Sequence, residues 1–163
     1  KIVLSISLLT NKKIVLLAHV SKDTEIIEAI DQLLNKKEKL KIKKITDLLL
    51  PSQARVIIGQ ANFIVTGRMH ASISAIQTTT PFIALSYSVK YKGVIGGLGL
   101  GSHIIEATPE KWGQSTLSTE VIEKVANLID KKIEIKNSLA EINSSNKEDI
   151  LMTIKKINTH LAS

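Results

Sequence analysis

The stretch of sequence that decides the fold reads FIVTGRMHASISAIQ and runs from Phe63 to Gln77. Its first three residues form a short apolar run, which is typical of a buried strand. Gly67 interrupts this run and small residues follow at helical spacing, so the pattern predicts a helix from Arg68 to Gln77. The small side chains would let the backbone of this helix lie close to a sheet or a ligand. The stretch therefore predicts a strand that passes directly into a helix.

Strand and helix patterns alternate on both sides of this stretch. The continuous apolar runs Ile14–Leu17 and Phe82–Leu85 predict two further buried strands. A helix is expected after the first of these, capped by Asp23 or Thr24, and another is expected to begin at Pro51. Such alternation predicts an α/β fold in three layers, with a mostly parallel sheet between helices on both faces. The first ten residues fit either a strand or the end of a helix.

The C-terminal part of the chain, residues 119–163, carries apolar residues at helical spacing. One long helix is expected to include residues 121–133, and a last amphipathic helix to include residues 150–161. The polar run at 144–146 is expected to separate the two. The glycine-rich segment 98–112 is expected to be irregular. The sequence therefore predicts a mainly helical C-terminus.

Length and composition restrict the class of protein. A chain of 163 residues fits one domain. It begins at Lys1 without an initiator Met, so we expect a piece of a longer polypeptide. The absence of cysteine excludes disulfides and thiolate chemistry, which makes a reducing cytoplasm the default expectation. No apolar run approaches the roughly 18–20 residues that span a bilayer. A location at the inner face of the membrane remains compatible with this composition.

The net charge of +7 comes mostly from one lysine-rich segment, residues 36–44. Within it, lysines alternate with Leu40 and Ile42, a pattern typical of an edge strand with one solvated face. Aromatic residues make up only 3% of the chain, so stacking platforms for nucleic acid are scarce and no nucleic-acid partner is expected. The segment leaves room for docking on an acidic partner or for peripheral association with a membrane.

Reactive side chains follow three of the predicted strands. His19 follows the first strand, Arg68 and His70 follow the second, and the third runs into Ser86-Tyr87-Ser88-Val89-Lys90. Ligands of open α/β sheets bind at the carboxyl ends of the strands, beside helix N-termini that present free N–H groups. If these strands are parallel neighbours, their ends share one edge of the sheet. The sequence therefore predicts an anion-binding site at this edge.

Other motifs carry no function in this interpretation. The segment Gly96–Ser102 lacks the last glycine of the dinucleotide pattern G-x-G-x-x-G and follows no clear strand, so we reject that pattern. His103 and His160 have no second ligand at metal-binding spacing and are interpreted as structural or surface residues. No metal ion is expected.

Several segments together resemble the polysaccharide pyruvyl transferase family. They are ANFIVTGRMHASISA at 61–75, TPFIALSYSVK at 80–90, LGL at 98–100 and, more loosely, LLAH at 16–19. The resemblance implies the Rossmann-like C-terminal half of a GT-B-like architecture, two α/β domains facing across a cleft. The N-terminal domain would then be missing from this chain, and the isolated piece could be inactive.

The resemblance also implies an activity and a set of residues. Members of the family transfer the pyruvyl group of phosphoenolpyruvate to two hydroxyls of a sugar or lipid-linked glycan as a ketal, and they release phosphate. Phosphoenolpyruvate is a substrate, and no cofactor is implied. By this similarity Arg68, His70 and the Met69 backbone would bind phosphoenolpyruvate, and His19 and Lys90 are weaker candidates. Ser86 and Tyr87, which end the strand before Lys90, are further candidates for substrate binding.

The residue types suit this substrate on chemical grounds as well. The planar guanidinium of Arg68 can hold a carboxylate or a phosphate through two hydrogen bonds. Histidine titrates near neutrality, so His70 could act as an acid or as a phosphate ligand, and His19 is a second catalytic candidate.

Two alternative functions stay open. A GT-B glycosyltransferase domain that binds a nucleotide sugar would need a carboxylate for the ribose hydroxyls, and Glu106 is the nearest candidate. A non-catalytic basic binding module would use the lysine-rich segment, and its binding would be sensitive to salt.

Overall fold

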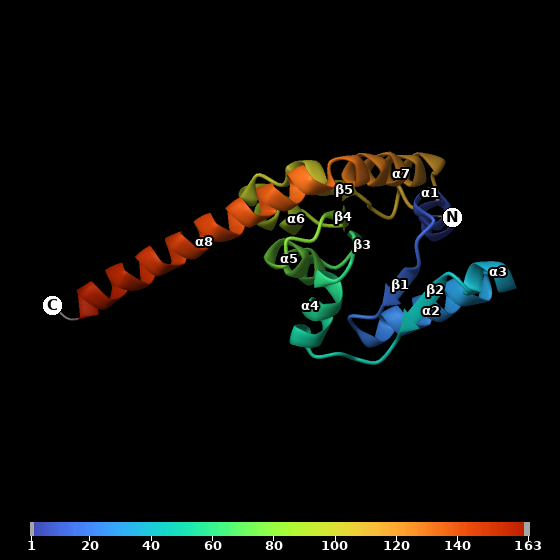
Figure 1. Cartoon of the computed structure of the whole chain (residues 1–163), viewed down its shortest axis with the longest axis horizontal. Helices are drawn as coiled ribbons and strands as arrows, with labels where there is room; N and C mark the ends of the chain where they lie inside the picture. Colours follow the sequence, from blue (N-terminus) through green and yellow to red (C-terminus); the bar gives the residue numbers. More distant parts are fainter. Residues whose placement is uncertain (1, 162–163) are drawn as a thin grey trace.

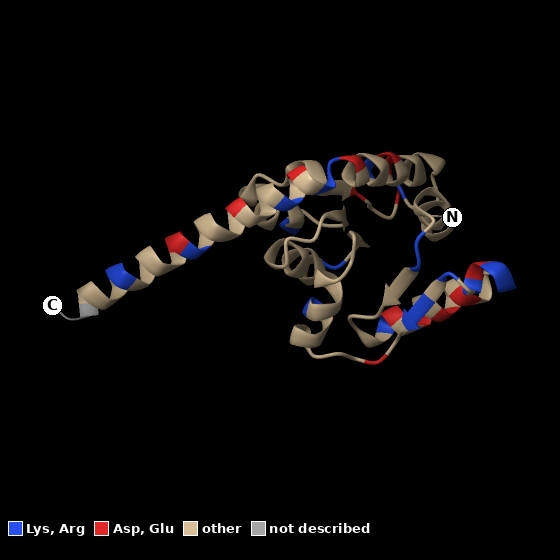
Figure 2. Ribbon diagram, viewed as in Figure 1, with Lys and Arg blue, Asp and Glu red and all other residues tan. Residues whose placement is uncertain are grey.

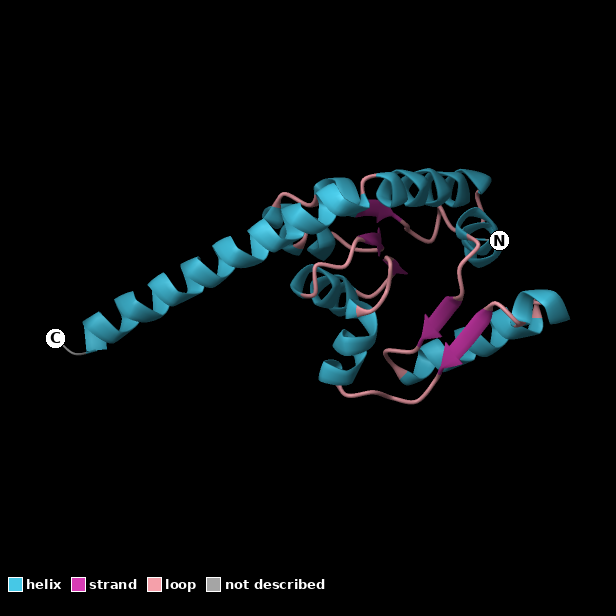
Figure 3. Cartoon of the chain, viewed as in Figure 1, coloured by secondary structure: helices cyan, strands magenta, loops and turns pink. Residues whose placement is uncertain are grey.

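The computed structural model describes residues 2–161, in which five short parallel strands are surrounded by helices (Figures 1 and 3). The strands are β1 (Ile14–Leu17), β2 (Ile42–Ile45), β3 (Ile64–Thr66), β4 (Phe82–Ser86) and β5 (Ile104–Glu106). The helices are α1 (Ile2–Thr10), α2 (Ser21–Gln32), α3 (Lys36–Lys39), α4 (Pro51–Gly59), α5 (Met69–Gln77), α6 (Lys90–Val94), α7 (Ser115–Asp130) and α8 (Lys132–Leu161), with short 3₁₀ turns at Gly96–Leu98 and Gly101–His103. The predicted α/β class with parallel strands and a helical C-terminus is confirmed.

The strands are divided between two sheets. β1 pairs with β2, and β3, β4 and β5 form a second sheet in that order, with every pair parallel. Within the described residues β1 pairs with β2 and not with β3, so the three predicted strands do not all neighbour one another. The edge of β1 that faces away from β2 therefore looks toward the outer edge of β3 across a hollow. Backbone pairing does not join the two sheets.

The strand-to-helix stretch folds as its sequence predicts. β3 ends at Thr66, Arg68 lies at the N-cap position with extended backbone, and α5 begins at Met69. The small residues Ala71, Ser72 and Ala75 are buried, because α5 packs closely on the sheet. The helix at Pro51 is confirmed too, with the proline in its first turn.

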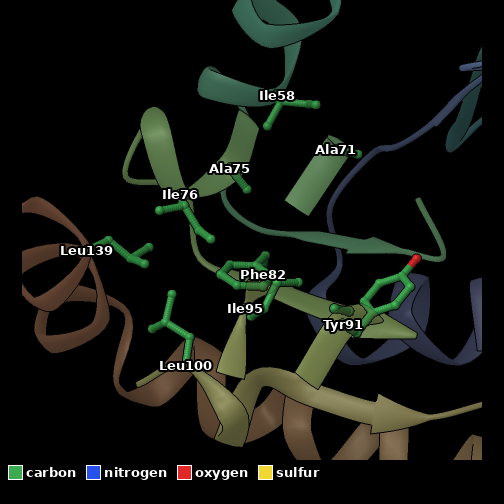
Figure 4. Packing of buried hydrophobic residues seen from close by; sticks show 10 residues of the cluster. Ile58, Ala71, Ala75, Ile76, Phe82, Tyr91, Ile95, Leu100 and Leu139 are labelled. Carbon is green, nitrogen blue, oxygen red and sulfur yellow. The ribbon is translucent and has the colours of Figure 1, made fainter. Parts of the chain in front are cut away.

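The three-stranded sheet has a hydrophobic core on each face. One core joins α4, α5 and the first part of α8 to the sheet, and Figure 4 shows Phe82 in the middle of it, between Ile76 and Leu139 on one side and Tyr91 on the other. The other core lies between the sheet and α7, where Val121 and Val125 are fully buried. Helices therefore cover both faces of this sheet, and the carboxyl ends of its strands stay accessible.

Several local predictions were wrong. The predicted edge strand begins only at Ile42, because Asn35 caps the short helix α3 and accepts hydrogen bonds from the N–H groups of Lys37 and Glu38. Leu40 is therefore 82% exposed. The segment 98–112, expected to be irregular, contributes β5, and Lys90 begins the short helix α6.

The predicted break at residues 144–146 is also absent, because α8 is a continuous helix of 30 residues. The two C-terminal helices separate instead at Lys131. The far half of α8 extends away from the rest of the molecule (Figure 1).

Of the first ten residues, which the sequence left undecided, Ile2–Thr10 form helix α1. Its residue Ile6 joins the core between the sheet and α7, and α1 packs against α7. Among residues 2–161, no helix is both long and apolar enough to cross a membrane.

Candidate functional site

The turn between β3 and α5 presents Arg68 at a helix N-terminus. The Thr66 hydroxyl accepts a hydrogen bond from the Arg68 N–H at 2.9 Å. The buried Tyr91 donates its hydroxyl hydrogen to the carbonyl oxygen of Gly67 at 2.6 Å, which ties α6 to this turn. The peptide group between Gly67 and Arg68 is thus held at its N–H by Thr66 and at its carbonyl oxygen by Tyr91.

Asp23, at the start of α2, connects this turn to the end of β1. Its Oδ1 atom lies 2.5 Å from Nη2 of Arg68, and its Oδ2 atom accepts hydrogen bonds from the N–H groups of His19 and Val20 at 2.9 and 3.2 Å. Both carboxylate oxygens are therefore engaged. The ion pair crosses from one sheet to the other, so it brings the ends of β1 and β3 together although these strands do not pair.

A cleft of about 440 Å³ opens beside this ion pair. Its polar lining comes from α2 and from the carboxyl ends of β1, β3 and β4, and apolar residues of β1, α2 and β3 complete the lining. The polar side chains of the lining belong to His19, Asp23, Thr66, Arg68 and Tyr87. A cation, an imidazole and a phenol thus face one cavity of a size that suits a small anion.

The electrostatics of the cluster keep Arg68 charged and favour neutral His19. Burial lowers the pKa of His19; the Asp23 carboxylate opposes this effect, and the nearby Arg68 and His70 add to it. Burial alone would raise the pKa of Asp23, but hydrogen bonds from Arg68, His19 and Val20 outweigh it, and the net shift is downward. The hydrogen bond to Asp23 raises the pKa of Arg68. The cleft therefore holds a permanent ion pair beside a histidine that favours its uncharged form.

Arg68 retains hydrogen-bonding capacity for a ligand. A guanidinium has five N–H donors, and Asp23 is paired with Nη2 alone. The Arg68 side chain is 39% exposed, so the remaining donors are open to solvent. Arg68 can therefore bind Asp23 and an anion at the same time.

His70 and Met69 follow Arg68 in the first turn of α5 but differ in their surroundings. His70 is exposed, and it lies near enough to His19 to act on the pKa of that imidazole. The Met69 side chain packs against the hydrophobic core, so only its backbone can face a ligand. N–H groups of a first helical turn have no partner within the helix and favour anions.

Ser86 and Lys90 lie outside this cleft. Ser86 is buried at the end of β4, and its hydroxyl donates a hydrogen bond to the carbonyl oxygen of Ser88. Lys90 is exposed at the start of α6. Tyr87 is the residue of this strand end that reaches the cleft, and its ring contacts the Tyr91 ring edge to face. The structure thus brings together His19, Arg68 and Tyr87 and leaves Ser86 and Lys90 at the side.

Asp23 is the residue of the site that sequence reasoning missed. The sequence indicated it only as a helix cap, because its partner Arg68 is 45 residues away. A partial signal was present, since an arginine at a helix N-terminus is electrostatically unfavourable and calls for a negative partner.

A larger hollow of about 1170 Å³ separates the two sheets. Its walls are mostly apolar side chains of α1, β1, α2 and β3, and His19 and Thr66 lie at its border with the smaller cleft. The ion pair of Asp23 and Arg68 borders the smaller cleft, and neither residue lines this larger hollow.

The residues of the alternative interpretations have other partners. Glu106 pairs with Lys111 at 3.0 Å. His103 stacks on Phe82 and contacts the carbonyl oxygen of that residue through Nδ1 at 3.0 Å, which confirms its structural role. Across residues 2–161, no three metal-ligating side chains come together to hold an ion.

The lysine-rich segment is partly neutralised by α2. Lys44 pairs with Glu28 and Asp31, and Lys39 pairs with Asp31. Figure 2 shows basic and acidic positions side by side over α2, α3 and β2. The segment is therefore a mixed surface, which weakens the case for a basic binding module.

Comparison with known proteins identifies a family. A family model described as polysaccharide pyruvyl transferase matches residues 1–89. The matched range contains His19, Asp23, Arg68 and Tyr87, and it ends one residue before Lys90. Comparison with curated proteins and with solved structures finds no match. Because the match covers more than half of the 163 residues, the chain belongs to the polysaccharide pyruvyl transferase family.

Proposed function

We propose that this chain binds phosphoenolpyruvate in the cleft beside Arg68 and serves the transfer of its pyruvyl group to sugar hydroxyls. The observation that carries the proposal is the Arg68 guanidinium, held by Asp23 at the edge of a cleft of about 440 Å³ with donors left open to solvent. An anion with a carboxylate beside a phosphate matches an arginine fork next to a helix N-terminus. Membership of a transferase family supports the same reaction class.

The reaction requires protonation of the methylene carbon, addition of one hydroxyl oxygen to carbon 2 across the double bond, and substitution of the phosphate at carbon 2 by a second hydroxyl oxygen. A proton adds to the methylene carbon, two acceptor hydroxyl oxygens bond to carbon 2, and the bond from carbon 2 to the phosphate oxygen breaks. The two hydroxyl protons replace the proton consumed and protonate the departing phosphate. The protein must therefore supply an acid, a base and charge compensation.

The described residues offer groups for each of these tasks. Arg68 compensates the negative charge of phosphoenolpyruvate and of the leaving phosphate. His70, exposed at the first turn of α5, is the proposed acid or phosphate ligand. His19 is the proposed base, because a lowered pKa favours the uncharged imidazole that can accept a hydroxyl proton. The Met69 backbone and Tyr87 complete the proposed binding site, and Lys90 and Ser86 are peripheral candidates.

The larger enzyme is also part of the proposal. We infer that the chain is the C-terminal half of a two-domain, GT-B-like enzyme in the cytoplasm, at or near the inner face of the membrane. The other domain would carry much of the site for the sugar or lipid-linked glycan acceptor. Phosphoenolpyruvate serves as substrate, and no cofactor is invoked.

The test is phosphate release from phosphoenolpyruvate by the full-length protein in the presence of acceptor glycan. Arg68→Ala and His70→Ala should each reduce the rate by about 10²-fold or more, because each removes a group that acts on the reacting atoms. Arg55→Ala is the matched control, since Arg55 is exposed on α4 and the exchange should leave the rate unchanged. Turnover near that of the unmodified enzyme in both site variants would refute the proposal.

Calorimetry separates this function from nucleotide-sugar transfer. Phosphoenolpyruvate should bind the full-length protein, and this binding should weaken in Arg68→Ala but not in Arg55→Ala. Binding of a UDP-sugar that is indifferent to Arg68 would favour the glycosyltransferase alternative.

A further inference from the structure

We propose that Asp23 is a positioning residue for the substrate anion, which orients the Arg68 guanidinium by holding one of its two terminal nitrogens. The inference rests on the proposed function and deepens it, because it adds Asp23, from the helix that follows β1, to the phosphoenolpyruvate site. It also gives a functional role to the ion pair of Asp23 and Arg68, which connects the end of β1 to the end of β3.

The first argument concerns how Asp23 is itself held. Its Oδ2 atom accepts hydrogen bonds from the His19 and Val20 N–H groups, so the carboxylate is fixed to the backbone that follows β1. The Asp23 side chain is only 15% exposed. A carboxylate with this much support has one orientation, and its Oδ1 atom points toward Arg68.

The second argument concerns what Arg68 would do without this partner. An arginine side chain loses rotamer entropy when it is fixed. Asp23 fixes it before any ligand arrives, and the other guanidinium donors remain free. An anion that binds a pre-ordered guanidinium does not have to supply this entropy itself.

The third argument concerns the competing effect of charge. The Asp23 carboxylate also reduces the positive potential that attracts an anion, so its removal could strengthen or weaken binding. Orientation predicts weaker binding after removal, and charge alone predicts tighter binding. The direction in which the dissociation constant changes therefore decides whether orientation or charge is the larger effect of Asp23.

A purely structural role must be separated as well, because Asp23 also satisfies backbone N–H groups at the start of α2. Asp23→Asn keeps an oxygen acceptor for these groups and removes the charge that holds Arg68. Asp23→Glu keeps the charge on a longer side chain. Asp31→Asn is the matched control, because Asp31 lies on the same helix and its ion pairs join Lys39 and Lys44 instead.

The experiment measures phosphoenolpyruvate binding to the full-length protein by calorimetry, with thermal unfolding of each variant as a check on folding. Asp23→Asn should raise the dissociation constant about tenfold, Asp23→Glu should recover part of the loss, and Asp31→Asn should change nothing. Unchanged or tighter binding in a folded Asp23→Asn protein would overturn the inference. If the unmodified protein does not bind phosphoenolpyruvate at all, the proposed function fails instead.

A double substitution shows whether Asp23 acts through Arg68. Lysine lacks the fork that binds a carboxylate and a ligand together, so Arg68→Lys should make binding insensitive to Asp23. Adding Asp23→Asn to Arg68→Lys should change the dissociation constant less than twofold. If Asp23→Asn weakened phosphoenolpyruvate binding equally in the unmodified protein and in Arg68→Lys, Asp23 would act on the fold and not on Arg68. This result too would overturn the inference. If Asp23→Asn does not fold, the comparison of Asp23→Glu alone and with Arg68→Lys decides the same point.

Discussion

His19 combines partial burial with a charged neighbourhood, and this combination determines how it responds to pH. Its backbone N–H is bound by Asp23, and its imidazole lines the cleft beside Arg68. Burial favours the neutral ring and lowers its pKa below the ordinary 6.5. The ring thus stays available as a proton acceptor at neutral pH.

We expect the NMR titration midpoint of His19 to lie below 6.5 in the folded protein. Because the unfolded chain then binds the proton more readily, folding stability is complete above pH 6.5 and declines as pH falls toward the folded pKa. Denaturant unfolding measured at pH 7.5 and at pH 5.5 should therefore show that the free energy of unfolding falls more between these two values in the unmodified protein than in His19→Gln. A midpoint above 6.5 would contradict the prediction and would favour His19 as an acid.

Among the elements, α8 changes its environment along its length. Its first half is part of the core, where Leu139 is fully buried and the Asn143 side chain donates a hydrogen bond to the carbonyl oxygen of Ile76. In its second half, Ile150, Ile154 and Ile157 are 60, 47 and 52% exposed. The serines and asparagine between the halves do not end the helix, because they cost only a few tenths of a kcal/mol each in a helix.

This division predicts unequal effects of two similar truncations in α8. Leu139→Ala should lower the free energy of unfolding by about 2–5 kcal/mol, because it opens a cavity in the core. Ile154→Ala should change it by less than about 0.5 kcal/mol, because the side chain already contacts solvent. Urea denaturation of the two variants measures both values. A large loss for Ile154→Ala would show that the second half of α8 is covered in solution.

At the scale of the whole molecule, the separation of the two sheets leaves two strand edges facing each other. The N–H groups of Ile14 and Ala18 donate to β2 or its flanking residues, so the N–H groups of the alternate residues Val15 and Leu17 point away from β2. Ile64 donates to the carbonyl oxygen of Pro81 on the β4 side, so the N–H group of Val65 points away from β4. The ion pair of Asp23 and Arg68 connects the two sides of this boundary near the carboxyl ends of β1 and β3.

Hydrogen exchange tests this arrangement directly. The amides of Val15, Leu17 and Val65 should exchange faster than the amide of Ile83 in the fully buried strand β4, because they have no strand partner. Equal protection of these four amides would contradict the divided sheet and would mean that β1 pairs with β3 in solution. Exchange followed with and without phosphoenolpyruvate would show whether the ligand changes this boundary.

The sequence by itself determined the elements whose cause is local. β3, α5 and β4 were predicted to within one residue at each end, because apolar runs, Gly67 and small residues at helical spacing act over one or two turns. The same local signals predicted helix α4 from Pro51 and marked Arg68 as a cation in need of an anion. Helix α6 and strand β5 were missed, because five and three residues are too short for a periodic pattern.

Only the tertiary structure decided which elements meet. Pairing of β1 with β2 instead of β3 depends on packing between distant segments, and so does the contact of Asp23 with Arg68. Leu40 was misplaced, because alternation alone does not reveal that Asn35 caps a helix just before it. Local periodicity decides whether a segment is a strand or a helix, but long-range packing decides which side chains of the candidate site share a cleft.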